Sequence, residues 1–282
     1  MANNFCVDAE CYVFQKCDSD NPSRVIHAAL VNKTYGLDKT NADTILDDLL
    51  AGELTGNVKI IRNIRGEKPR PETQELDGFG RRPVKVGNST HTINYQDQYA
   101  IENQDFYNTI KFASQNYDLY YFTDGYIWDA SGNLITFYGD PVLTSGPNDL
   151  VMTEATIKWT AKTSPTASAF DTDVLEEGLF YEITPGAYPS GQITMTADAV
   201  ISDSLTAALS QYVANTCDLL WSIENNSDPD KLEATINEST GQLDLTGQDA
   251  GTGVVTFDVV VKNDCGGCVQ GSFKFTVTLI AA

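Results

Sequence analysis

The fold is decided by residues 106–162, which read FYNTIKFASQNYDLYYFTDGYIWDASGNLITFYGDPVLTSGPNDLVMTEATIKWTAK. The spacing of Phe106, Ile110 and Ala113 predicts a short amphipathic helix. Aromatic and apolar runs at residues 119–122, 126–128, 134–138 and 151–159 are typical of strands. Residues 129–133 are a turn signal, so the third run is predicted to return along the second. We therefore predict that one helix and four strands form the centre of a β domain.

A second helix and two further strands are predicted upstream of this stretch. Residues 41–50 repeat apolar side chains at helical spacing, and Gly52 is predicted to follow the end of that helix. The buried face of the helix is expected to consist of Ile45, Leu46, Leu49 and Leu50. Residues 57–64 are typical of a strand, and residues 84–95 resume the strand pattern with alternating side chains.

Residues 65–82 interrupt the strand pattern. Pro69 and Pro71 remove donors that a central strand would need, and Asp77-Gly78 marks a turn. Eight of the chain's 18 basic residues lie between Lys59 and Lys85. A loop of this length is uncommon in a compact domain unless it has a function. We expect a protruding loop or open hairpin that contacts an acidic protein surface rather than nucleic acid, because acidic residues alternate with the basic ones.

The composition changes after residue 163. Residues 164–190 contain small polar residues, Pro and Gly, which are typical of a linker. From residue 192 onward, short runs of alternating apolar and polar residues recur between turn signals. We therefore predict a mainly β chain with one or two short helices and three parts. These are a β-sandwich or barrel domain at residues 1–163, a linker at 164–190 and a second β-sandwich at 191–282.

The chain is strongly acidic, with a formal net charge of -21. Residues 1–163 carry 15 basic and 22 acidic residues, whereas residues 164–282 carry 3 and 17. This charge argues against general binding to nucleic acid or to an anionic membrane surface. The first residues lack the pattern of a secretory signal, and no window approaches the roughly 18 apolar residues of a membrane span. Synthesis in the cytoplasm is therefore expected.

The sequence contains no catalytic signature. Its two histidines, His27 and His91, are too few to build a nucleophile arrangement, and His91 is expected to be structural. Carboxylate pairs such as Asp47-Asp48 are expected to face solvent. A pair of glycosidase carboxylates stays open, because the separation of the two groups in space decides that chemistry. We expect no enzymatic activity, no cofactor and no metal.

Six cysteines are present, and thiols are expected for them in a reducing compartment. Cys265-Gly266-Gly267-Cys268 is interpreted as a turn flanked by thiols. A zinc site or a disulfide that includes Cys217 stays open as an alternative. Cys6, Cys11 and Cys17 are irregularly spaced, and a metal site formed with His27 is a further alternative. Residues 225–230 are rich in oxygen ligands that would suit calcium, but they are interpreted as a plain loop.

Residues 221–279 resemble the bacterial immunoglobulin-like and cadherin-like repeats. The resemblance rests on Trp221-Ser222-Ile223, on the hairpin sequence at 236–243 and on the Gly-rich turn that leads into the strand at 254–259. It implies an immunoglobulin-like β-sandwich. It implies little about function, because such domains serve adhesion, decoration and spacing.

Residues 40–162 resemble a tail-tube protein of a tailed bacteriophage, of the kind found in phages of Bacteroidetes hosts. The shared features are the long loop at 65–82, the strand that leads into residues 106–111, and the last strand at 155–159. A tube domain followed by an immunoglobulin-like domain also resembles tail-tube proteins of some long-tailed phages. The Cys-rich first 20 residues have no counterpart in this resemblance.

The resemblance implies a structural role in the virion. Subunits would close a ring, taken as a hexamer, by pairing sheets between neighbours, and rings would stack into a tube with an acidic lumen that conducts DNA without binding it specifically. Partners would be further copies and the tape-measure, tail-terminator and distal-tail proteins. Alternatives are a capsid decoration protein, a head–tail adaptor, or a cell-surface module that binds carbohydrate or mediates adhesion. Inter-subunit contacts are expected at Arg65, Lys68, Arg70, Arg81, Arg82, Thr156 and Lys158.

Overall fold

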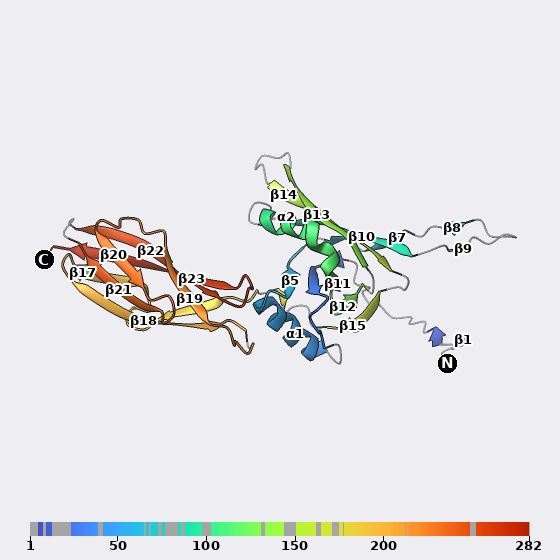
Figure 1. The fold of residues 1–282 in the computed structure, drawn as a ribbon, viewed down its shortest axis with the longest axis horizontal. Helices are drawn as coiled ribbons and strands as arrows, with labels where there is room; N and C mark the ends of the chain where they lie inside the picture. The colour runs from blue at the N-terminus through green and yellow to red at the C-terminus, as the bar shows by residue number, and fades with distance from the viewer. Residues whose placement is uncertain are drawn as a thin grey trace.

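The structure is a computed structural model of the chain, and it is mainly β. It describes residues 5–7, 10–12, 24–38, 42–64, 66–67, 69–72, 75–76, 84–85, 88–97, 103–130, 133–143, 151–161, 165–170, 175–176, 178–211, 213–248 and 252–281. Figure 1 shows two parts side by side, an N-terminal part with two α-helices and a C-terminal part built from strands.

Two larger sheets form the N-terminal part. The five-stranded sheet has the order β15 (Thr166–Ala169), β12 (Tyr126–Asp129), β11 (Tyr117–Thr123), β4 (His27–Asn32) and β5 (Val58–Ile61). The four-stranded sheet has the order β13 (Asn133–Leu143), β14 (Val151–Ala161), β10 (Ser89–Asp97) and β7 (Arg70–Glu72). Short two-stranded pairs join β1 (Phe5–Val7) to β2 (Glu10–Tyr12), β3 (Arg24–Val25) to β6 (Gly66–Glu67), and β8 (Glu75–Leu76) to β9 (Val84–Lys85).

The five-stranded sheet is the middle layer, which explains the unbroken aromatic run in β11. Leu119 and Tyr121 belong to a core shared with the four-stranded sheet. Tyr120 and Phe122 face the other way and join a core shared with helix α1 (Ala42–Leu54). A strand that is covered on both faces needs apolar side chains at every position, rather than at alternate positions. Helix α2 (Gln104–Ala113) closes the first core with Tyr107 and Ile110 and continues into a 3-10 turn, η1 (Ser114–Asn116).

The predicted return of the third strand along the second is wrong. β13 pairs with β14 in the four-stranded sheet, whereas β12 pairs with β11 and β15 in the other sheet. The stretch at 106–162 is therefore divided between two layers. The fully buried Phe137 of β13 packs in the core between those layers, which keeps β13 away from β12.

The helix predicted at residues 41–50 is present but longer than expected. It continues through Gly52 and ends at Leu54, while Ile45, Leu49 and Leu50 are buried as predicted. A Cβ at Gly52 would lie 2.3 Å from Cγ2 of Val58. Glycine at this position therefore lets the helix pack closely on β5 and does not end it.

Residues 70–92 include the two arms of a hairpin, in agreement with the predicted open hairpin. β7 pairs with β10 and β8 pairs with β9, both antiparallel. Pro71 lies on the edge strand of its sheet, where a missing N–H costs least. Figure 1 places β8 and β9 at the end of the molecule opposite the C-terminus. Arg65, Lys68, Arg81, Arg82 and the side chain of Arg70 lie outside the described residues.

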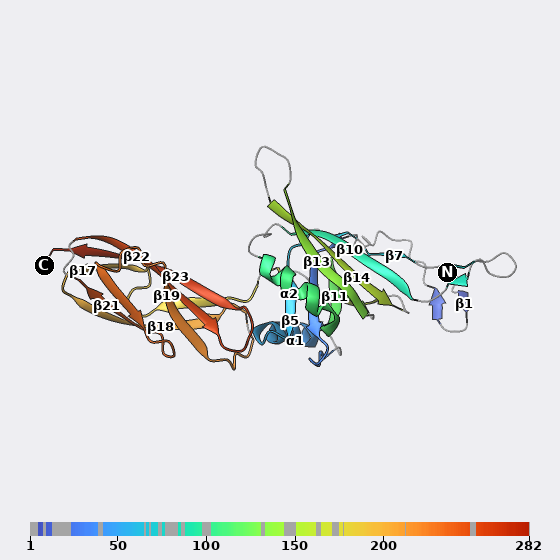
Figure 2. The same cartoon turned by 45° about the horizontal axis from the view of Figure 1, so that its top comes forward.

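Two four-stranded sheets face each other in the C-terminal part. One has the order β16 (Tyr181–Pro185), β18 (Val200–Leu209), β21 (Gln242–Gly247) and β20 (Leu232–Ile236). The other has the order β17 (Gln192–Thr196), β23 (Gln270–Ile280), β22 (Gly253–Asn263) and β19 (Leu219–Glu224), with β17 and β23 parallel. Figure 2 shows the strands of this part running along the long axis of the molecule.

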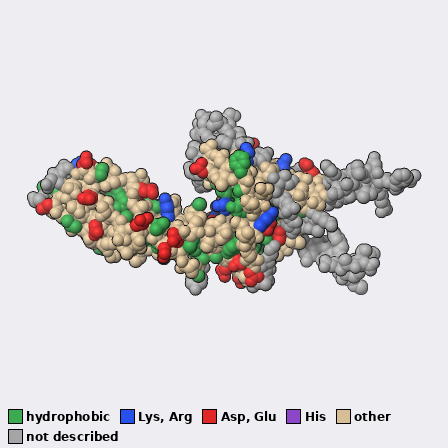
Figure 3. Space-filling view, in the orientation of Figure 1, with side chains coloured by type: hydrophobic (Ala, Val, Ile, Leu, Met, Phe, Trp, Pro, Cys, Tyr) green, Lys and Arg blue, Asp and Glu red, His purple; other side chains and the backbone are tan. Residues whose placement is uncertain are grey.

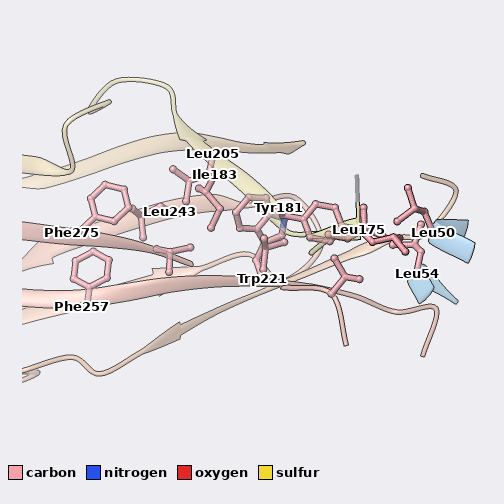
Figure 4. Close-up of a cluster of buried hydrophobic side chains, with 14 of the residues drawn as sticks. Leu50, Leu54, Leu175, Tyr181, Ile183, Leu205, Trp221, Leu243, Phe257 and Phe275 are labelled. Carbon is pink, nitrogen blue, oxygen red and sulfur yellow. The ribbon is translucent and has the colours of Figure 1, made fainter. Parts of the chain in front are cut away.

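The predicted linker at 164–190 is mostly part of the two packed units. Residues 166–169 add β15 to the N-terminal sheet, and β16 begins the sandwich at Tyr181. Between them Phe170, Leu175 and Leu179 are buried. Figure 4 shows the result, an apolar row that runs from Phe257 and Phe275 through Tyr181 and Leu175 to Leu50 and Leu54 of α1. The two parts therefore share one hydrophobic core.

The contrast between the faces of β14 gives a testable prediction. Ile157→Ala removes a fully buried side chain and is expected to lower the free energy of unfolding by about 2–5 kcal/mol. Thr156→Ala, on the opposite face, removes one exposed hydrogen bond to Asn94 and is expected to cost less than about 1 kcal/mol. Urea denaturation of both variants checks this, and equal losses would show that the assigned faces are wrong.

Candidate functional site

The last strand of the deciding stretch does not offer a free edge. β14 pairs with β10 on one side and with β13 on the other along most of its length. The contact of Thr156 and Lys158 with another subunit stays a prediction, and it would use their side chains rather than the backbone of β14. Thr156 and Lys158 lie side by side on the face that points away from the core, where both side chains are half-buried. Proline at residue 156 would break the subunit's own sheet.

Another strand of the same sheet has an open edge. β13 is an outer strand of 11 residues, and its second side has no strand partner among the described residues. On the far side of the sheet, β7 pairs with Thr90–Thr92 of β10, and β6 also lies against β10. Open edges of this kind are templates for adding a strand from another chain.

The direction of the free N–H groups of β13 follows from its proline. Pro141 has no N–H, and a proline within a paired edge strand normally turns its nitrogen to the unpaired side. Backbone groups alternate in direction along a strand, so residues two and four positions earlier point the same way. Gly139 should therefore direct its backbone N–H group to the open side of β13, whereas Phe137 is fully buried and offers no exposed N–H group.

The outer face of this sheet is polar and close to neutral. Its described side chains lie on β7, β10, β14 and β13, and register places Thr92, Lys158 and Thr136 in one row. Asn94 and Thr156 form the next row, joined by a 3.0 Å hydrogen bond from the Thr156 hydroxyl to Asn94 Oδ1. Glu72, Glu154 and Lys158 are charged side chains described on this face, Glu72 as the register partner of Thr90. The face is thus dominated by hydroxyl and amide groups rather than by the acids expected from the net charge.

Arg62 joins the two parts of the molecule. Its two terminal nitrogens donate to the two carboxylate oxygens of Glu53, each at 2.5 Å, and its Nε donates to the Leu175 carbonyl at 2.9 Å. Both charged side chains are only 16% exposed. Arg62 thereby ties the end of α1 to the segment that leads into the sandwich. No sequence pattern marked this residue, because its partners come from two distant segments.

Contacts from the sandwich complete this junction. Nδ2 of Asn263, at the end of β22, donates to the Leu54 carbonyl at 2.7 Å. That carbonyl belongs to the last residue of α1, so the amide caps a helix end that has no partner inside the helix. Close packing follows at Gly267, where a Cβ would lie 2.4 Å from the Leu54 oxygen. At Gly56 a Cβ would lie 2.5 Å from the Gly266 oxygen.

A cleft of about 380 Å³ lies beside this junction. Its walls include Glu53, Arg62, Phe106, Tyr107, Gly267 and Cys268. Next to it, Tyr107 donates to Asp97 Oδ2 at 2.9 Å, which leaves Tyr95 to donate to the Tyr107 hydroxyl at 3.0 Å. Burial raises the pKa of both tyrosines, so they stay protonated and act as donors. This network fixes α2 to β10.

Neither histidine is available to a substrate. His27 is fully buried, and its Nδ1 accepts the backbone N–H of Asn63 at 3.1 Å. Burial, together with the smaller effect of the nearby Arg62 charge, lowers the pKa of His27 to about 4. His91 is buried and stacks on Trp159 with ring centroids 5.1 Å apart. The structural role expected for His91 agrees with this geometry.

The state of the C-terminal cysteines differs from the expectation of thiols. Cys217 and Cys265 form a disulfide with Cα atoms 5.6 Å apart, and Cys268 is an exposed free thiol. The sequence left this pairing open as an alternative. Cys6 and Cys11 are opposite each other in the β1–β2 pair, with side chains outside the described residues, as is the whole of Cys17.

The oxygen-rich loop at 225–230 uses its side chains within the protein. Asp228 pairs with Lys231 at 2.8 Å, and the Asn225 amide donates to Asp258 at 2.9 Å. The hydrogen bond and the charge of Lys231 lower the pKa of Asp228. These contacts agree with the interpretation of a plain loop.

Acidic side chains outnumber basic ones on the visible face of the C-terminal part, as Figure 3 shows. Of the helices in the described part of the chain, neither is long and apolar enough to cross a membrane. No family model matches the chain, and no curated protein matches it.

The Arg62 contacts predict a specific loss of stability. Arg62→Met leaves the Glu53 carboxylate without its partner and the Leu175 carbonyl without a donor, so the free energy of unfolding is expected to fall by about 3 kcal/mol. Adding Glu53→Gln should recover more than half of this loss, because no unpaired charge then remains. Urea denaturation of the two variants measures both effects. An additive further loss in the double variant would contradict the ion-pair role.

A second prediction concerns pH. Between about pH 6.5 and pH 4 the unfolded chain binds a proton at His27 that the folded chain does not bind, so acidification through this range favours unfolding. From pH 7 to pH 5 this one group should cost about 2 kcal/mol. His27→Gln, which keeps an acceptor for Asn63, should reduce the loss between pH 7 and pH 5 by that amount. An unchanged pH dependence in denaturant titrations would refute this role.

Proposed function

We propose that this chain is a structural subunit that assembles with copies of itself through the open edge of its four-stranded sheet, as the tail-tube subunit of a tailed bacteriophage. The single observation that carries the proposal is the open edge of β13, an outer strand of 11 residues. In the proposed assembly this edge pairs with a different part of the next copy, which is a head-to-tail contact. Head-to-tail contacts generate closed rings or helical filaments.

The polar face supports a tube in particular. In a closed ring the sheets of successive subunits would form one continuous wall, with the hydroxyl and amide rows of β10 and β14 along one surface. Lys and Arg contacts to phosphate are what hold DNA, and Lys158 is the basic side chain described on this face. A surface of this kind would let DNA pass without strong binding. The proposed role is to conduct DNA, and it includes no catalytic step.

The hairpin and the sandwich support the same assembly. β8 and β9 extend the hairpin away from the sandwich, so they could reach the next ring, where the sequence predicts contacts through basic residues. The acidic sandwich is held at a fixed place by the shared core and by Arg62. Placed on the outside of a tube, its charge would keep long assemblies apart. The partners and the location in a virion are part of this proposal.

Electron microscopy tests the assembly directly. Purified protein at high concentration is expected to form rings, taken as hexamers, or long tubes in negative stain. A chain that stays monomeric at every concentration would overturn the proposal. A decoration or adaptor protein would instead occur in virions at a fixed number of copies, so counting copies per particle separates those roles from a tube that contains many stacked rings.

Gly139 offers a variant that tests the β13 edge. Gly139→Pro removes an N–H that points to the open side and is expected to abolish rings and tubes, while the subunit keeps its fold because the β13–β14 ladder does not use that N–H. Gly139→Ala keeps the N–H and is the matched control. Circular dichroism and denaturation should give both variants unfolding free energies within about 1 kcal/mol of each other. Tubes formed normally by the proline variant would place the seam elsewhere.

A further inference from the structure

Three cysteines meet where the sandwich contacts α1, and only two of them are bonded. Cys217 lies before β19, while Cys265 and Cys268 lie in the loop between β22 and β23. The disulfide joins Cys217 to Cys265, and Cys268 is exposed on the wall of the junction cleft. Cys265 therefore has two potential partners, one 48 residues away in sequence and one three residues away.

The loop between the two nearer cysteines can bend to bring them together. Its central residues are Gly266 and Gly267, and Gly266 has a φ of 85°, in the region that glycine adopts without steric cost. Cysteines separated by two residues are a common disulfide pair. In the present conformation, however, the Cys268 side chain points to solvent while Cys265 is bonded to Cys217. Bonding Cys265 to Cys268 thus requires the glycine turn to change shape.

That turn is also the part of the loop that packs on α1. A Cβ on Gly267 would lie 2.4 Å from the Leu54 oxygen and 2.5 Å from the Glu53 oxygen, so the backbone of the turn touches the helix end. The neighbouring Asn263 caps the same Leu54 carbonyl. Any reshaping of residues 266–267 would therefore disturb the contact between the two parts of the molecule.

We propose that the Cys268 thiol exchanges with the Cys217–Cys265 disulfide, so that Cys265 can be bonded to either Cys217 or Cys268. Only the isomer with the Cys217–Cys265 bond packs on α1. In the exchange, the Cys268 thiolate attacks the Cys265 sulfur. The Cys265–Cys268 bond forms, the Cys217–Cys265 bond breaks, and Cys217 leaves as a thiolate that takes up a proton. The number of disulfides is unchanged, so no oxidant or reductant is consumed. This inference is independent of the proposed assembly.

Disulfide mapping of the full chain tests the exchange. Among Cys217, Cys265 and Cys268, the free thiol is expected at Cys268 in protein held at pH 6, as read by alkylation at acid pH and peptide mass spectrometry. After incubation at pH 8.5, where thiolates form, a measurable share of the thiol should appear at Cys217 at a rate that does not depend on protein concentration. Cys268→Ser should prevent this. A Cys217 that stays bonded in folded protein at pH 8.5 would overturn the proposal.

A pair of variants tests the effect on docking. Cys217→Ser leaves Cys265 and Cys268 to bond with each other, whereas Cys217→Ser with Cys268→Ser has no disulfide at this loop. Backbone amide hydrogen exchange at residues 54–57 and 266–267 is expected to be at least about tenfold faster in the single variant. The reason is that a Cys265–Cys268 disulfide changes the shape of the glycine turn and breaks its contact with α1. Equal exchange in both variants, or two free thiols in the single variant after air oxidation, would contradict the coupling.

Discussion

The central constraint on this structure is the strand edge of the four-stranded N-terminal sheet that has no backbone hydrogen-bond partner within the described part of the chain. Within the subunit β14 is satisfied on both sides, while the outer side of β13 has donors and acceptors without a strand partner among the described residues. An edge of 11 residues is unusually long to leave open, because such edges invite pairing with other chains. Self-assembly is the simplest way to satisfy it.

The rest of the fold holds that sheet in place. The five-stranded sheet supports it from one side and packs on α1 with the other, and α1 in turn carries the sandwich through a shared core. Arg62 and Asn263 fix the connection with hydrogen bonds to α1 and to the segment before β16. A sandwich that is fixed in this way would take the same position in every copy, which a repeating assembly requires. The disulfide beside the junction adds a covalent tie within the sandwich.

The sequence predicted the features that depend on local chemistry. The aromatic strand β11 and the amphipathic helix that contains Phe106 and Ile110 follow from side chains near each other in sequence. Features that depend on distant partners were missed. Nothing near Asn263 indicates that it caps a helix 209 residues earlier, and small residues at 166–169 gave no sign of adding a strand. The pairing of β13 with β14 rather than with β12 was also missed, because the sequence of a strand does not specify which strands flank it.

Amide hydrogen exchange on β13, compared between dilute subunits and assembled particles, tests the central claim most directly. The account predicts that the N–H group of Gly139 exchanges freely in the subunit and becomes protected at least about tenfold in the particle. The amides of β14 should be protected in both states. Particles in which Gly139 exchanges as fast as in the free subunit would show that the chain assembles without this edge, and would contradict the account.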